Sequence, residues 1–274
     1  MSEGGGGADA GSIKELGWRQ GSIVPLDLVK DLLDFGELPA TVNEADILIV
    51  VSHDCDVTSA NLANEPSVEL LLARLLSEGT PNGALTHGKN PRRLHFLVEI
   101  DGRPTAVEAR ADERFVIDRT RLLGCRPELG RVCSRQVRDE IVLWLVKRYS
   151  RTAFPDAFNA RIRKAQRPIA RALESNGQAL REIFLTMSSW DELPEGEPYR
   201  VQLIATMTRE DYEDPEGRER AHQALDKVEE KLHGCSGVEI VEALLVSEAE
   251  VSLDEFRQME RFDFDYLSAE TDEP

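Results

Sequence analysis

The chain has 274 residues, of which 51 are Asp or Glu and 33 are Lys or Arg, so its formal net charge is −18. Hydrophobic residues make up 41% of the chain, which is enough to fill the core of one large domain or two modest ones. No apolar run approaches the roughly 20 residues that cross a bilayer, which excludes a membrane-spanning protein.

The N-terminal part begins with a glycine-rich, acidic segment, and we predict that residues 1–16 are disordered. Because this segment lacks the basic and apolar parts of a secretory signal, we expect a cytoplasmic protein. A turn and a short strand follow, and the strand is limited by Pro25. Residues 28–35 have helical spacing, whereas 46–52 (DILIVVS) and 67–74 (SVELLLAR) predict strands.

A glycine- and asparagine-rich loop, residues 79–93, separates these strands from a predicted hairpin. The hairpin pairs residues 94–100 with 104–109. Its turn is Asp101-Gly102, a dipeptide that supplies the positive φ angles of a type I′ turn. Residues 115–117 then begin a further short strand.

Two helices are predicted in the middle of the chain. The first begins after Ser134, which we expect to cap it, and is apolar almost all round over 141–146. The second covers 156–174, with Asp156 as its N-cap and Pro168 as a kink or break. It carries five basic side chains, namely Arg161, Arg163, Lys164, Arg167 and Arg171.

The C-terminal part alternates strands with a helix. Strands are predicted at 183–187, 199–207 and 238–246, a helix at 215–232, and a tail around 253–266. Two strands that flank a helix, with a glycine turn after it, favour a small α/β domain of the split βαβ type.

The acidic excess belongs to this C-terminal part. Residues 1–150 hold 18 basic and 23 acidic side chains, residues 151–190 hold 7 and 3, and residues 191–274 hold 8 and 25. The overall charge disfavours a general nucleic-acid coat, but the asymmetry predicts a basic middle segment that the acidic part masks.

The cysteines are dispersed, at Cys55, Cys125, Cys133 and Cys235. They form no disulfide framework and no Cys-x-x-Cys pair, so we predict small buried residues, no metal and no other cofactor. The alternative is a four-ligand zinc site, made of His53, Cys55, Cys125 and Cys133.

Several segments resemble the PemK/MazF-like toxin family. Three of them are similar, in order, to strands of that family: 21–24, 47–52 and 68–74. Residues 116–123, then Leu129-Gly130-Arg131-Val132 and a helix near Arg138, are similar to its late strand, Gly-Arg-Leu turn and terminal helix. The resemblance covers about residues 18–148.

The resemblance implies an SH3-like barrel with a packed helix, and a sequence-selective endoribonuclease that needs no metal. The family's catalytic Arg and its Thr or Ser lack counterparts, since the loop from Leu26 to Asp46 has only Lys30 as a base and the strand ends in Ala73-Arg74.

We therefore predict an α+β protein whose SH3-like barrel with packed helices precedes a small split-βαβ domain. Its four parts are a disordered N-terminus (1–16), the barrel (17–133), a helical segment with a basic face (134–180) and an acidic α/β domain (181–274).

The candidate catalytic residues follow the buried strand, in the string Ser52-His53-Asp54-Cys55-Asp56. His53 could act as a general base and Cys55 as a nucleophile, while Asp56 would favour protonated His53 or a bound cation. Arg74 completes the predicted set. The alternative is an Asx-type turn in which Asp54 or Asp56 caps the backbone and Cys55 lies in the core.

The candidate nucleic-acid contacts lie on a loop and on the basic helix. In the loop, the donors are Lys89, Asn90, Arg92 and Arg93, which could grip an RNA backbone. On the helix, they include Arg161 and Lys164. The alternative is that these bases face water or the acidic C-terminal part.

The sequence is compatible with three functions. The first is a nuclease or nuclease-derived effector of a bacterial toxin or phage-defence system, restrained by the acidic domain. The second is a non-catalytic module that binds nucleic acid or protein. The third is a Cys55-dependent transferase or hydrolase. The expected partners are RNA, a protein that contacts the acidic domain, and a second copy of the chain in a homodimer.

Overall fold

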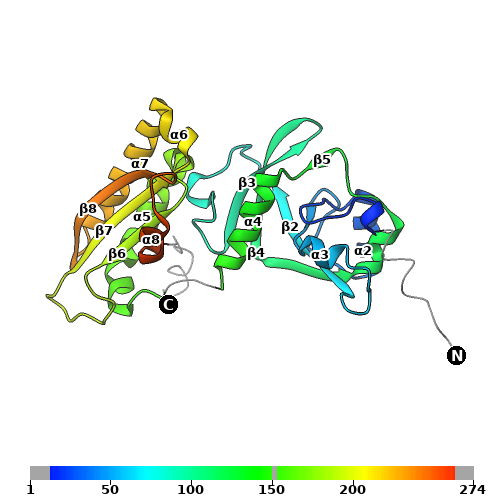
Figure 1. The fold of residues 1–274 in the computed structure, drawn as a ribbon, viewed down its shortest axis with the longest axis horizontal. Helices are drawn as coiled ribbons and strands as arrows, with labels where there is room; N and C mark the ends of the chain where they lie inside the picture. Colours follow the sequence, from blue (N-terminus) through cyan, green and yellow to red (C-terminus); the bar gives the residue numbers. More distant parts are fainter. Residues whose placement is uncertain (1–12, 150–152, 263–274) are drawn as a thin grey trace. The chain divides into compact units, whose positions relative to one another are not determined.

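The computed structural model describes residues 13–149 and 153–262, which form two compact units (Figure 1). The first unit contains residues up to 81 and residues 92–145, and the second contains 82–91 and the residues from 146 onward. This division differs from the predicted one, because a segment of the predicted barrel and most of the basic helical segment belong to the second unit. Residues 1–12 of the predicted disordered segment lie outside the described residues, but Ile13 is fully buried.

The first unit is built on a curled antiparallel sheet with the strand order β1-β2-β4-β3-β5. The strands are β1 (Ile47–Val50), β2 (Ser67–Leu75), β3 (Arg93–Ile100), β4 (Arg103–Asp118) and β5 (Arg131–Val132). Helices and this sheet together confirm the predicted mixture of α and β structure.

The predicted hairpin is confirmed as β3 and β4. Its turn residues both have positive φ angles, 49° for Asp101 and 75° for Gly102, as a type I′ turn requires. The strands predicted at 104–109 and 115–117 are one continuous strand, β4, which pairs with β3 along its first half and with β2 at residues 107–109 and 114–118.

Two apolar cores hold the first unit together. Helix α4 (Arg135–Lys147) packs Ile141 and Trp144 into the first core, against side chains of β1 to β4. Ser134 caps this helix as predicted, since its Oγ accepts the N–H of Val137 at 3.2 Å.

The second core lies under helix α2 (Leu26–Asp34) and the 3₁₀ helix η2 (Arg119–Gly124). Trp18 anchors it, because its indole N–H donates to the main-chain oxygens of Leu122 at 3.0 Å and Cys125 at 2.9 Å. A short helix, α3 (Asp54–Val57), follows β1.

The second unit has a four-stranded sheet with the order β8-β7-β6-β9. The strands are β6 (Ile183–Met187), β7 (Tyr199–Met207), β8 (Val238–Ser247) and β9 (Glu260–Arg261). The two strands that flank helix α7 (Pro215–His233) pair directly with each other in parallel. A split βαβ unit has another strand between them, so this unit departs from the predicted arrangement.

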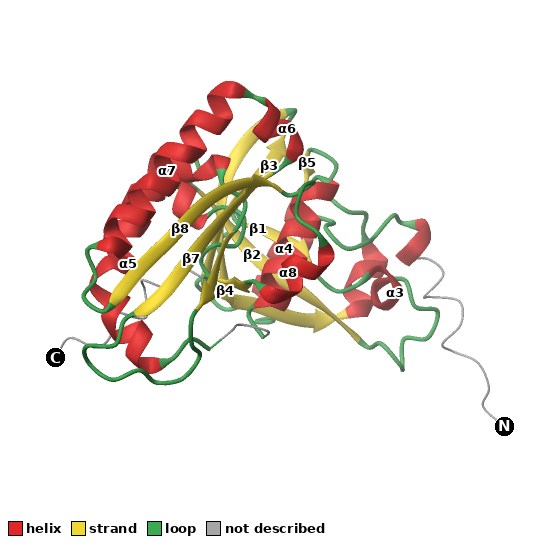
Figure 2. Ribbon diagram, turned by 60° about the vertical axis from the view of Figure 1, so that its left-hand side comes forward, coloured by secondary structure: helices red, strands yellow, loops and turns green. Residues whose placement is uncertain are grey.

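Helices α5 (Asp156–Asn176) and α7 lie side by side on one face of this sheet (Figure 2). The core between helices and sheet contains Phe158, Ile162 and Leu173 of α5 and Leu203 of β7. The short helices α6 (Arg209–Glu213) and α8 (Leu253–Gln258) and the 3₁₀ turns η1 (Gly83–Leu85) and η3 (Gly177–Ala179) complete the unit.

Helix α5 does not begin as predicted. Pro155 occupies the N-cap position, and Asp156 is the first helical residue. The carboxylate of Glu192, distant in sequence, accepts the N–H groups of Asp156 and Ala157, each at 2.7 Å. Glu192 therefore caps the helix in place of Asp156. The helix continues through Pro168.

Within the described part of the chain, every helix is too short or too polar to span a bilayer.

The segment 82–91 is fixed to the second unit by a close backbone contact. A Cβ atom on Gly83 would lie 2.3 Å from the main-chain oxygen of Leu173 and 2.9 Å from the nitrogen of Gln178. Only a residue without a side chain permits this approach to the end of α5.

We therefore expect Gly83→Ala to destabilise the second unit by about 2 kcal/mol, because backbone atoms cannot yield as a flexible side chain does. Chemical denaturation of the full chain measures this effect. Gly124→Ala is the matched control, since no heavy atom lies within 4 Å of its added Cβ. Equal stability of both variants would contradict the close contact.

Candidate active site

The predicted residues His53, Cys55 and Asp56 lie at and within helix α3. His53 is its N-cap, and its Nδ1 accepts the N–H of Cys55 at 3.3 Å. Cys55 is exposed, in contrast to the core position of the alternative prediction. Asp56 uses its main-chain oxygen to accept a hydrogen bond from Arg119. His53 thus caps the helix, and Asp56 joins it to η2.

Arg74 is not near this group. Ser52, next to His53, accepts the N–H of Glu69 at the start of β2, whereas Arg74 lies near the other end of that strand. Five residue steps along a strand correspond to about 17 Å. The antiparallel pairing of β1 and β2 therefore separates Arg74 from the other members of the predicted catalytic set.

Two of the predicted nucleic-acid contacts are structural. The side chain of Lys89 is 1% exposed, and its Nζ donates to the main-chain oxygens of Gly83 at 3.2 Å and Thr86 at 3.3 Å and to Thr86 Oγ1 at 3.1 Å. Asn90 is fully buried. The loop thus encloses the side chains of Lys89 and Asn90, and neither side chain presents its donors to a ligand.

Arg161 is also structural. Its Nη1 donates to the main-chain oxygens of Glu197 and Gly237, and its Nη2 to those of Leu193 and Pro194, at 2.8 to 2.9 Å. Its guanidinium also lies 4.7 Å from the ring centroid of Tyr199. The Nη1 and Nη2 donors that we predicted to contact nucleic acid are thus used within the second unit. Lys164 and Arg92 are exposed.

A different group of polar side chains gathers on the first unit, where the pairing of β4 with β2 is irregular. Leu71 pairs with Arg114, and Ala73 pairs with Ala109, so β2 advances two residues while β4 advances five. The three extra residues of β4 form a large bulge. Bulges bend a strand and redirect its side chains, and they recur beside active sites.

We name this group the bulge cluster. It consists of Asp46, Arg74, Arg93, His95, Glu108, Arg110, Asp112 and Glu113.

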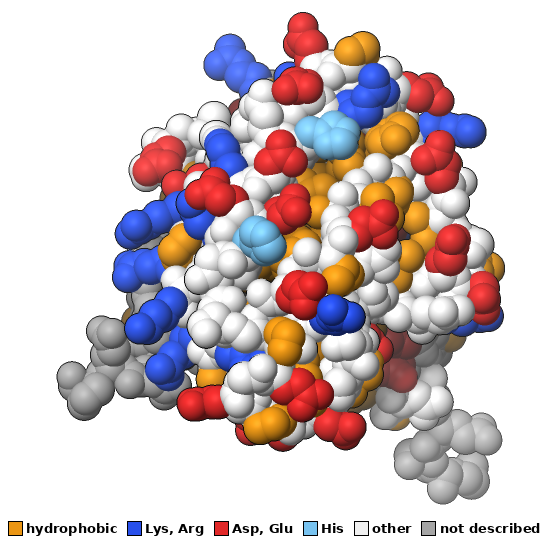
Figure 3. All heavy atoms as spheres, turned by 90° about the vertical axis from the view of Figure 1, so that its left-hand side faces the viewer, with side chains coloured by type: hydrophobic (Ala, Val, Ile, Leu, Met, Phe, Trp, Pro, Cys, Tyr) orange, Lys and Arg blue, Asp and Glu red, His pale blue; other side chains and the backbone are white. Residues whose placement is uncertain are grey.

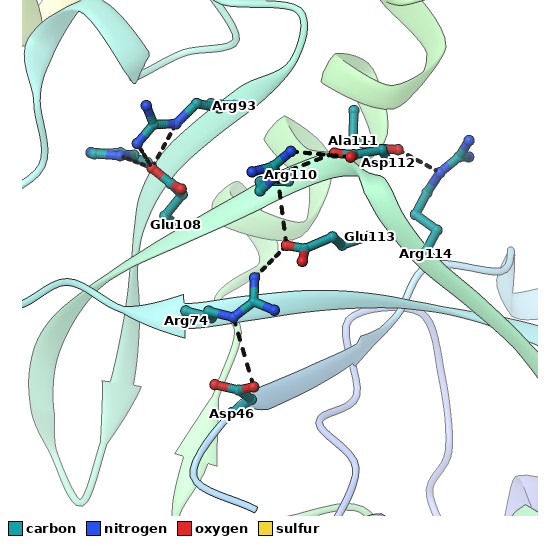
Figure 4. A network of polar contacts seen from close by, with 10 residues as sticks. Asp46, Arg74, Arg93, Glu108, Arg110, Ala111, Asp112, Glu113 and Arg114 are labelled. Atoms are coloured by element: carbon teal, nitrogen blue, oxygen red, sulfur yellow. Dashed lines mark hydrogen bonds and ion pairs between the residues drawn. The ribbon is translucent and has the colours of Figure 1, made fainter. Parts of the chain in front are cut away.

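Glu113 is held between two arginines of the bulge cluster (Figure 4). Arg74 donates to its carboxylate and also lies 3.8 Å from Asp46. Arg110 lies 3.9 Å from Glu113 and 3.2 Å from Asp112. The hydrogen bond with Glu113 raises the pKa of Arg74, and that with Asp112 raises the pKa of Arg110, so both arginines remain charged.

The second part of the bulge cluster is centred on Glu108. In the strand register, Glu108 pairs with Arg74 on one side and with His95 on the other, which places the three residues in one row across the sheet. His95 Nε2 lies 2.8 Å from Glu108 Oε2. Arg93 Nε donates to the same oxygen at 2.9 Å (Figure 4).

The charge state of Glu108 follows from two opposing effects. Burial by itself raises the pKa of this carboxyl, but hydrogen bonds from His95 and Arg93 outweigh burial and hold the pKa below its ordinary value. Glu108 is therefore ionised at neutral pH. A carboxylate, an imidazole and arginines on one face can together move a proton and bind a phosphate.

The sequence contains a signal for this group that our prediction did not use. Arg93, His95 and Glu99 alternate with buried apolar residues along β3, so they share one face. The run Arg110 to Arg114 places four charged residues within a strand, which breaks its alternation and marks the bulge.

The cysteines do not contribute reactive thiolates to this group. Burial raises the pKa of Cys125 and Cys235, and it raises the pKa of Cys133 to about 12. Among residues 13–149 and 153–262, no three His, Cys, Asp or Glu side chains come together as a metal site, and this includes the four residues of the zinc alternative.

Glu108→Gln should lower the free energy of unfolding by about 2 kcal/mol at neutral pH, because it removes charge-assisted hydrogen bonds. A carboxyl whose pKa is lowered by folding stabilises the protein above its unfolded pKa, and loses that effect as the pH falls through its folded pKa. The difference between variant and parent should therefore shrink below about pH 4.

Chemical denaturation across a pH series measures this difference. Glu99→Gln, at an exposed position of β3, is the control, and it should change stability by less than about 0.5 kcal/mol throughout. A pH-independent effect of Glu108→Gln would contradict the assigned charge state.

Comparison with protein-family models, with curated proteins and with solved structures finds no match to the chain.

Proposed function

We propose that the protein is a PemK/MazF-like endoribonuclease that needs no metal, and that its reaction centre is the bulge cluster. In this proposal the curled sheet of the first unit corresponds to the family's SH3-like barrel, and α4 corresponds to its terminal helix. The observation that carries the proposal is the row Arg74, Glu108 and His95, with Arg93 on the same carboxylate oxygen.

RNA cleavage without a metal requires a base, an acid and cations at the phosphate. Glu108 would take the proton of the 2′-hydroxyl as its oxygen attacks phosphorus. Protonated His95 would give a proton to the 5′ oxygen as the bond from phosphorus to that oxygen breaks. The products are a 2′,3′-cyclic phosphate and a 5′-hydroxyl. The 2.8 Å contact between the two side chains offers a path for the proton to return.

Three arginines would stabilise the charge that develops on the phosphate oxygens. The side chains of Arg74, Arg93 and Arg110 are 34%, 35% and 50% exposed, so a phosphate can reach them. Arginine binds phosphate with two parallel hydrogen bonds, which positions the group as well as neutralising it. The carboxylates of the acidic C-terminal part would compete with RNA for these arginines, which is how we propose that activity is restrained in a toxin or phage-defence system.

A binding role without cleavage is the second candidate function. The low pKa of Glu108 favours it, because a weaker base removes a hydroxyl proton less readily.

Incubation of the full chain with mixed RNA in the presence of a chelator tests the proposed function. We expect cleavage that leaves cyclic phosphate ends. His95→Asn and Glu108→Gln should each slow it by about a hundredfold or more, since each removes a proton-transfer group.

His53→Ala and Glu99→Gln are the matched controls and should retain the parent rate. Circular dichroism checks that every variant is folded. Loss of cleavage in His53→Ala with retention in Glu108→Gln would overturn the assignment. Binding of RNA by a parent chain that never cleaves it would establish the second candidate instead.

A further inference from the structure

The second unit carries a row of basic side chains on the outer face of α5. We name it the basic stripe, and it consists of Arg163, Lys164, Arg167 and Arg171, all exposed. The opposite face of the helix is buried in the core, through residues such as Ile162, Ile169 and Leu173. The helix is therefore held rigidly, and its polar face is presented to solvent.

The spacing of the basic stripe is regular. Arg163, Arg167 and Arg171 follow one another at intervals of four residues, which places them on one side of the helix about 6 Å apart. Lys164 lies beside the first of them. Between Ala157 and Leu173 the helix has no acidic residue, and its two carboxylates, Asp156 and Glu174, lie before and after the row.

The neighbouring helix, α7, carries acidic and basic side chains in mixture. The bases of α7 are matched by carboxylates close by, since Arg220 lies 3.7 Å from Glu216 and Lys231 lies 2.7 Å from Glu230. In Figure 3, Lys and Arg side chains gather along the left edge of the face shown, and Asp and Glu side chains are spread over the rest of it. With four exposed bases on one helix, the basic stripe is a local positive surface on an acidic unit.

An aromatic ring lies at the N-terminal end of α5. Trp190 is 45% exposed, and its ring is stacked on Phe154 with the centroids 5.6 Å apart. Phe154 precedes the helix by two residues. An exposed ring can stack against an unpaired base but not against a base inside a duplex.

We propose that the basic stripe binds the phosphate backbone of single-stranded RNA. This site is distinct from the bulge cluster and would anchor the substrate rather than cleave it. The choice of RNA as the ligand rests on the proposed function. Three of the four bases are arginines, whose planar guanidinium groups match phosphate oxygens.

A binding assay with an uncleavable ligand tests this proposal independently of catalysis. The probe is a short fluorescein-labelled 2′-O-methyl RNA, in which the attacking hydroxyl is blocked, and the readout is fluorescence anisotropy of the full chain over a salt series. The test variant combines Arg163→Gln, Lys164→Gln, Arg167→Gln and Arg171→Gln. The matched control makes the same change in charge on α6 and α7, with Arg209→Gln, Arg220→Gln, Lys227→Gln and Lys231→Gln.

We expect the stripe variant to bind at least about tenfold more weakly at low salt, and to lower the slope of log K against log salt by roughly 3, as the loss of four phosphate contacts requires. The control variant should bind within about twofold of the parent, because its charges lie off the site. A duplex of the same sequence should bind more weakly than the single strand.

Equal losses in both variants, or no loss in the stripe variant, would overturn the proposal. Equal binding of duplex and single strand would reject the role of an unpaired base. Cleavage of unmodified RNA separates this inference from the proposed function. A stripe variant with a raised KM and an unchanged kcat supports both, whereas stripe-dependent binding by a chain that never cleaves RNA supports the stripe alone.

Discussion

The first unit depends on the way β4 is constrained along both of its edges. A strand must alternate its side chains between two faces, and β4 has hydrogen-bonded neighbours on each side. It keeps Val107, Ala109 and Ala111 in the first core and Ile117 in the second. An unbroken register between β4 and β2 could not place both groups of side chains in their cores. The bulge between the two segments shifts the register so that each group reaches its core. The charged residues that cannot enter either core are placed together there.

This origin accounts for the pairing of charges in the bulge cluster and for the chemistry that we propose for it. Each carboxylate of the group faces at least one arginine, so the polar face of the sheet is tolerated beside two apolar cores. The same pairing fixes Glu108 and His95 in one row with arginines on either side. If a phosphate entered, the arginines would exchange carboxylate partners for phosphate oxygens. The second unit, whose basic stripe belongs to a rigid helix, would contribute affinity rather than chemistry.

Local patterns were sufficient to predict most of the secondary structure. Strands β6 and β7 agree with the prediction at both ends, and the Asp101-Gly102 turn and the Ser134 cap are confirmed, because neighbouring residues determine these features. The roles of Lys89 and Arg161 were not predictable, since their acceptors are main-chain oxygens that only the folded loops bring together. The sequence also predicts the site at residues 53–56, because these polar residues are neighbours in the chain. The residues of the bulge cluster are distant in the chain and are brought together only by strand pairing.

We propose that RNA meets the chain at the bulge cluster and not at the end of β1. Backbone amide spectra of the full chain, recorded by NMR during titration with 2′-O-methyl RNA, test this most directly, because they locate the ligand without requiring cleavage. The account predicts shifts at residues 93–95 and 108–113, together with 163–171, and little change at 53–56. Shifts confined to 53–56, with 93–95 and 108–113 unaffected, would contradict it.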